Sequence, residues 1–327
     1  MAFASPLPSP PLPEPTLSAR RTLVRGLSLL DSVLLLVGGI IGSGIFLTAG
    51  PIASAVHKSF YFLSVWIVGG LISLLACFAF AEMGAMFPEA GGQYVFLREA
   101  YGEFPAFLYG WMIFTVGQSG TIAALAVGFA QYIGAIVPAA GATIPVASLL
   151  GFTLTRGDLV ALCSIALLTA VNVIGLKRGS GLINVATIAK FGAIALFVLL
   201  GLAIGHGSWS NYAVSVPSVQ ASTLAQGISS FGVALIAVFW AFDGWVYITW
   251  VAGEIKDPQR TLPRAMVLGV LFVGIVYLVV NLVYLYALPI TQVANENTIA
   301  QAAAVKLFSP GAAWWLSAII ALSCFGA

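Results

Sequence analysis

The chain has 327 residues, of which 60% are hydrophobic and only 7% are charged, and its formal net charge is +2. A soluble globular domain carries about 25% charged residues, so this composition indicates an integral membrane protein. The small, scattered positive charge argues against a nucleic-acid partner. Apolar runs of about 20 residues are typical of helices that cross a bilayer, whereas barrel strands alternate over about ten residues.

The first 26 residues are expected to form a disordered cytoplasmic tail. The segment from Ser5 to Pro15 reads SPLPSPPLPEP. It contains too many prolines for a helix and too few apolar residues for a signal peptide.

Eight helical spans are expected after the tail, each of them an apolar run between more polar loops. They are Ser32–Val56, Phe60–Ala81, Phe104–Val137, Leu159–Leu176, Leu182–Ile204, Leu224–Ala252, Ala265–Leu288 and Ala312–Ala327. A short interfacial helix is expected at Gln93–Tyr101, and short surface helices within Thr291–Phe308. Because the chain ends inside the eighth run, we expect a fragment of a longer transmembrane protein.

The basic residues of the loops predict the orientation of these spans. If the N-terminus is cytoplasmic, the inner segments hold Arg20, Arg21, Arg25, Arg98, Lys177, Arg178, Lys256, Arg260 and Arg264. The outer segments then hold only Lys58, Arg156 and Lys306. Cytoplasmic loops are enriched in lysine and arginine, so we expect a multi-pass protein of the cell inner (cytoplasmic) membrane with its N-terminus inside.

Glycines interrupt the first and sixth spans near their centres. The first reads GGIIGSGIF from Gly38 to Phe46, and the sixth reads FWAFDGW from Phe239 to Trp245. Lipid offers no hydrogen-bond partners, so irregular backbone at this depth requires a surrounding of protein or a hydrated cavity. Paired breaks indicate the substrate site of a transporter. The alternative, that glycines only permit close helix packing, is preferred for Gly38, Gly39, Gly69 and Gly70.

The breaks predict binding groups for a zwitterionic amino acid. N–H groups at the start of a half-helix hold carboxylates, and carbonyl groups at a half-helix end hold ammonium groups. The candidates for the substrate carboxylate are Gly42, Ser43 and Gly44. The candidates for the substrate ammonium are the carbonyls of Ile40, Ile41, Trp240, Ala241 and Phe242. The apolar side chains around the breaks favour a neutral amino acid.

Three residues near the breaks have two interpretations each. Lys190 is the only charge in the fifth span; it is either a coupling residue, as a fixed cation or proton carrier, or a lysine that reaches an interface. Asp243, before Gly244, is expected to cap the second half-helix or to contact the substrate. Trp240 either closes over the substrate or packs as an ordinary core aromatic.

Patterns for other chemistry are absent from the sequence. It contains no Cys/His spacing typical of zinc sites, no G-x-x-x-x-G-K-[ST] loop and no arguable Ser/His/Asp arrangement. We therefore expect no metal, no cofactor and no enzymatic activity. The cysteines Cys77, Cys163 and Cys324 all lie in apolar runs, so no disulfide is expected within the chain or to a partner subunit.

Three motifs, in this order, resemble the amino acid–polyamine–organocation superfamily and most of all its L-type amino acid transporter family, in a bacterial-type form. They are GGIIGSGIF, FAEMGAMFPEAGGQYVFLREAYG and FWAFDGWVYITWVAGEIKDPQRTLPRA. The resemblance implies an inverted-repeat fold, with a five-helix repeat over 27–205 and a partial second repeat over 206–327. It also implies alternating access, an aromatic gate at Trp240, and Lys190 at a position that binds sodium in related transporters.

The leading functional prediction is therefore a secondary transporter of neutral L-amino acids, working by sodium-independent exchange or by proton coupling. One alternative is a polyamine or organic-cation carrier, for which Asp243 is the available carboxylate. Another is a membrane receptor or fragment that does not transport, which predicts binding without flux.

Overall fold

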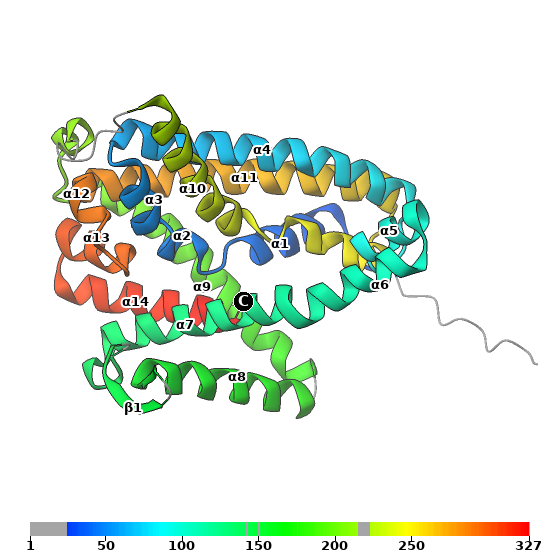
Figure 1. Cartoon of the computed structure of the whole chain (residues 1–327), viewed down its shortest axis with the longest axis horizontal. Coiled ribbons are helices and arrows are strands. Elements are labelled where there is room, and N and C mark those ends of the chain that lie inside the picture. The colour runs from blue at the N-terminus through cyan, green and yellow to red at the C-terminus, as the bar shows by residue number, and fades with distance from the viewer. Residues whose placement is uncertain (1–24, 142, 150, 175, 215–222, 327) are drawn as a thin grey trace, which may run out of the picture.

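The computed structural model describes residues 25–141, 143–149, 151–174, 176–214 and 223–326. The tail expected over 1–26 lies almost wholly outside the described residues. Helices dominate the described chain, and the longest of them run alongside one another in Figure 1. The predicted helical class is confirmed, apart from one small hairpin.

The first three apolar runs form helices. The first comprises α1 (Leu29–Ile40), α2 (Gly44–Leu47) and α3 (Ala49–Val56), and the second is α4 (Ser59–Met86). The expected short helix is confirmed as α5 (Gln93–Tyr101). The third run comprises α6 (Glu103–Met112), the π-helical turn η1 (Ile113–Gly117) and α7 (Gln118–Ile136).

The connection after α7 contains structure that the sequence did not predict. A 3-10 turn, η2 (Pro138–Ala140), leads to an antiparallel hairpin of β1 (Pro145–Leu149) and β2 (Phe152–Thr155), in which Leu149 pairs with Phe152. The fourth and fifth runs follow as α8 (Arg156–Ile174) and α9 (Leu176–Ala203).

The remaining elements contain the second break. They are η3 (Trp209–Ala213), α10 (Leu224–Phe242), the 3-10 helix η4 (Trp245–Glu254), α11 (Pro258–Ala287), α12 (Ile290–Val293), α13 (Ile299–Leu307) and α14 (Pro310–Gly326). The helices expected within Thr291–Phe308 are thus confirmed as α12 and α13, although α12 begins one residue earlier.

Five helical stretches among the described residues are long and apolar enough to cross a membrane. They are Leu29–Leu47, Ser59–Met86, Glu103–Ile136, Leu224–Glu254 and Pro258–Ala287. Two further apolar helices, Lys190–Ala203 and Pro310–Phe325, are shorter. The chain is therefore a multi-pass helical membrane protein.

The core forms around α11, which packs along α4 and α1. Small residues permit close helix packing, since a Cβ added at Gly269 of α11 would collide with Leu36 of α1, and one added at Gly69 of α4 would collide with Val238 of α10. The prediction that Gly69 serves helix packing is confirmed. The same prediction for Gly39 is wrong, because a Cβ added there would meet nothing within 4 Å.

The two broken spans run in opposite directions and contact each other along both halves. The helix before the first break, α1, contacts η4, and the helix after it, α3, contacts α10. The far ends of α1 and η4 are joined by a parallel bridge between Leu27 and Ile255. In this bridge, Leu27 N–H donates to the Glu254 carbonyl at 3.0 Å, and Lys256 N–H donates to the Leu27 carbonyl at 2.9 Å.

Candidate functional site

The two breaks meet directly at their glycines. A Cβ added at Gly44 would lie 2.6 Å from the Ala241 Cα, and one added at Gly244 would lie 2.9 Å from the Gly39 carbonyl oxygen. Gly244 also has a φ of 112°, in the region that favours glycine. These two positions therefore require glycine, because the opposing atoms are backbone and have no side chain to move.

A tyrosine that sequence reasoning missed ties the two breaks together. The Tyr277 hydroxyl of α11 lies 3.0 Å from the Ile40 carbonyl oxygen and 3.0 Å from the Ala241 carbonyl oxygen. The side chain is fully buried and its ring contacts those of Trp66 and Phe242 edge to face. A hydroxyl has one proton, so the two carbonyls share it or take it in turn. A tyrosine inside an apolar run was the available signal, since a buried phenol usually finds a partner.

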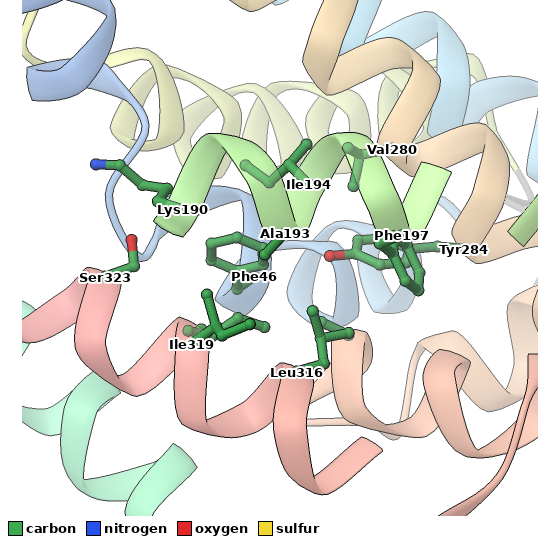
Figure 2. A pocket seen from close by; sticks show the side chains of 12 residues that line it. Phe46, Lys190, Ala193, Ile194, Phe197, Val280, Tyr284, Leu316, Ile319 and Ser323 are labelled. Carbon is green, nitrogen blue, oxygen red and sulfur yellow. The ribbon is translucent and has the colours of Figure 1, made fainter. Parts of the chain in front are cut away.

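Lys190 is held against the first break and does not reach an interface. It is buried in α9, and its Nζ donates to the Gly38 carbonyl at 3.0 Å and to the Ile41 carbonyl. Figure 2 shows its side chain at the edge of a narrow cavity between α9 and α14, with the Ser323 hydroxyl nearby. The cavity volume is about 10 Å³, enough for one water molecule.

The candidate carboxylate site contains an unused hydroxyl. Ser43 is 1% exposed, and its Oγ has no hydrogen-bond partner among the described residues. A Cβ added at Gly128 of α7 would lie 3.3 Å from the Ser43 Cβ, so α7 passes close to the break. The Gly42 N–H donates to the Ile40 carbonyl, whereas the N–H groups of Ser43 and Gly44 donate to no described group.

The carbonyls that are candidates for binding the substrate ammonium differ in the hydrogen bonds that they already accept. The Tyr277 hydroxyl donates to the carbonyls of Ile40 and Ala241, and the Lys190 ammonium donates to the carbonyl of Ile41. The Trp240 carbonyl accepts from the Asp243 N–H at 3.2 Å. Within the described residues, the Phe242 carbonyl at the end of α10 accepts no hydrogen bond outside its own helix. Each carbonyl oxygen has two lone pairs, so these contacts leave acceptor capacity at the breaks.

Asp243 does not cap the second half-helix. Gly244 precedes η4, and no side-chain cap is formed there. The Asp243 carboxylate is exposed and accepts instead from the Tyr247 hydroxyl at 2.9 Å. The neighbouring Trp240 is half-buried. In the described part of the chain, no three side chains of His, Cys, Asp or Glu are grouped to hold a metal ion.

Replacing Tyr277 with phenylalanine is expected to weaken the junction of the breaks by about 1–3 kcal/mol, because two buried carbonyls lose their donor. The measurement is the thermal unfolding of the detergent-solubilised protein. Tyr284→Phe is the matched control, since Tyr284 is also buried in α11 but its hydroxyl has no partner among the described residues. Equal losses of stability in both variants would contradict the assigned role.

Comparison with known proteins identifies a family and relatives of this chain. A family model described as amino acid permease matches residues 27–327. The chain is 31% identical over 306 residues to the serine/threonine exchanger SteT of Bacillus subtilis, covering 93% of this chain and 65% of the relative. It is 28% identical over 307 residues to the b(0,+)-type amino acid transporter 1 of Mus musculus, covering 94% of this chain and 60% of the relative.

A third relative is the Asc-type amino acid transporter 1 of Homo sapiens, 27% identical over 313 residues, with 95% of this chain and 58% of the relative covered. The chain belongs to the amino acid permease family, whose members are membrane transporters and not enzymes. It spans about three fifths of the length of the curated relatives that it matches.

Proposed function

We propose that the protein moves neutral L-amino acids across the cytoplasmic membrane by sodium-independent exchange, through alternating access to a site at the two breaks. The single observation that carries this proposal is the direct contact of the breaks at Gly44 and Ala241. One break contains an unused hydroxyl, that of Ser43, and the other contains the carbonyl end of α10. Together these groups suit the carboxylate and the ammonium of an amino acid.

In this proposal the substrate carboxylate binds Ser43 Oγ and the N–H groups of Ser43 and Gly44. The substrate ammonium binds the carbonyls of the opposite ends, with Phe242 the least committed of them. Trp240 closes over the bound substrate as a gate. Apolar neighbours such as Ile41 and Ile45, both fully buried, favour a neutral side chain.

Lys190 serves as a permanent cation in the place of a bound sodium ion. Its ammonium group donates to two carbonyls of the first break, as a metal cation would coordinate them. This arrangement supports transport without sodium, and the name of the Bacillus subtilis relative, an exchanger, supports exchange.

Alternating access involves the two broken spans moving as a unit. The bridge between Leu27 and Ile255 joins the start of α1 to the end of η4, and a second contact ties η4 to the first residue of α5. There the Trp250 Nε1 donates to the Gln93 side chain at 2.7 Å. We assign 27–205 to a five-helix repeat and 206–327 to part of its inverted counterpart, with the N-terminus cytoplasmic.

The test is uptake of labelled L-serine into proteoliposomes without sodium. We expect uptake into vesicles preloaded with unlabelled L-serine and little into empty ones. Uptake driven by a pH gradient alone would contradict exchange and favour proton coupling. The same assay on a chain extended to the length of the relatives separates a wrong function from an insufficient length, since absence of uptake in both would contradict transport.

The Asp243→Asn variant tests the choice between neutral and cationic substrates. If the substrate side chain is neutral, L-serine uptake is expected to keep its half-saturating concentration within about fivefold, because an exposed carboxylate contributes less than about 1 kcal/mol. Competition by L-arginine or a polyamine is measured in both proteins. Strong competition in the unchanged protein that is lost in Asp243→Asn would support the organic-cation alternative instead.

A further inference from the structure

A polar cavity, separate from the one beside Lys190, lies between α7, the start of α8 and the loop before α13. Its volume is about 280 Å³, close to the lower end of the range of small-molecule sites, about 300–1,000 Å³. Its lining side chains include Gln131, Thr143, Asp158, Asn297 and Thr298. Figure 1 shows the elements around it gathered at the end of the molecule that carries β1 and α13.

Several polar groups of this cavity are unused. The side-chain amides of Gln131 and Asn297 make no hydrogen bond to any other described residue. The Asp158 Oδ2 accepts from the N–H and the hydroxyl of Thr155, both at 2.8 Å, and its Oδ1 accepts from no described group. The two ion pairs of the described residues both involve Arg98, so the charge of Asp158 has no cationic partner there.

The cavity is close to the candidate substrate site along α7. Gly128 packs on Ser43 at the first break, and Gln131, which lines the cavity, is three residues further on, or about 4.5 Å along the helix axis. The loop that closes the cavity is fixed to α3, because the Ser54 hydroxyl donates to the Ala294 carbonyl at 2.8 Å. A ligand in the cavity would therefore lie about one helical turn from the breaks, on the outer side in the proposed orientation.

We propose that this cavity is a second, outer binding site for an amino acid, in which Asp158 binds the ammonium group and the amides of Gln131 and Asn297 bind the carboxylate. One unpaired carboxylate beside two uncharged amide donors is complementary to a zwitterion. The site raises the local concentration of substrate before it enters the breaks. The role of the site in supplying substrate rests on the proposed transport function, whereas the binding of an amino acid to the cavity does not depend on it.

The first experiment is equilibrium binding of labelled L-serine to the detergent-solubilised chain, with L-glycerate, which has a hydroxyl in place of the ammonium, as the competitor. We expect two classes of site. Asp158→Asn should weaken one of them by about tenfold, while Gly44→Ala abolishes the other. Asp158→Glu is the matched control, since it keeps both the charge and the bond to Thr155. Glycerate should not compete at the outer site.

The second experiment measures L-serine uptake from the outside and exit from the inside of cells that express the protein. Asp158→Asn should raise the outer half-saturating concentration about tenfold and leave both the maximal rate and the inner value unchanged. An unchanged outer value together with unchanged binding would overturn the proposal, as would equal losses in the Asn and Glu variants. If binding depends on Asp158 but no flux is measured, the binding site is supported and the proposed transport function is contradicted.

Discussion

Alanine at position 44 is expected to reduce amino acid exchange by at least about 100-fold, because a displacement of about 1 Å in a preorganised site has effects of that size. The added methyl would lie 2.6 Å from the Cα of Ala241. A backbone atom cannot rotate away, so the first and sixth spans must separate. Uptake into preloaded proteoliposomes measures the loss.

Gly39→Ala is the matched control for this prediction. It adds the same methyl group five residues earlier in the same span, where nothing lies within 4 Å, and it should leave exchange and stability close to those of the unchanged protein. If Gly44→Ala exchanges normally, the breaks are not in the contact that the structure describes. If both variants fail alike, the glycines serve the flexibility of the span and not the contact.

Replacing Lys190 with alanine is expected to lower both amino acid exchange and stability. The carbonyls of Gly38 and Ile41 lose their donor, and each unsatisfied buried group costs about 1–3 kcal/mol. We expect exchange to fall at least tenfold, roughly 1.4 kcal/mol or more, and the unfolding temperature to fall with it. Measuring both on the same preparation separates a loss of folded protein from a loss of function.

The ionic composition of the assay then tests why Lys190 matters. If its charge replaces a metal cation, sodium chloride should partly restore exchange in Lys190→Ala, and choline chloride at equal ionic strength should not. Equal behaviour in the two salts would contradict the role as a fixed cation. Exchange that remains normal in Lys190→Ala would contradict any functional contact between α9 and the first break.

Much of the helical framework could be predicted because its determinants are local. Each of the eight apolar runs forms helix among the residues that the structure describes, with the first and sixth interrupted at their breaks, and the short helix at Gln93–Tyr101 is confirmed. The hairpin of β1 and β2 was missed. The residues of β1, Pro145 to Leu149, do not alternate between apolar and polar, whereas those of β2, Phe152 to Thr155, do. The pairing needs both strands, so the alternation of β2 alone does not predict it.

The candidate site was partly predictable for the same reason. Glycines inside an apolar run mark a break whatever surrounds it, so Gly42–Gly44 and Gly244 were found from the sequence. The prediction that Asp243 caps the second half-helix was wrong, since its carboxylate accepts a hydrogen bond from the hydroxyl of Tyr247, one turn further on. That outcome depends on how the chain turns at Gly244, and its φ of 112° could not be predicted from the neighbouring residues.

By itself, the sequence determined that this protein crosses a membrane, where its helices lie, where two of them break, and that a single lysine sits in the fifth span. Only the tertiary structure decided which groups meet: Gly44 with Ala241, Lys190 with the first break, Tyr277 with both breaks, and Asp158 with the cavity beside α7. Spans form because each stretch must satisfy its own backbone hydrogen bonds in lipid. Contacts between residues far apart in the chain depend instead on how whole helices pack, which no local pattern encodes.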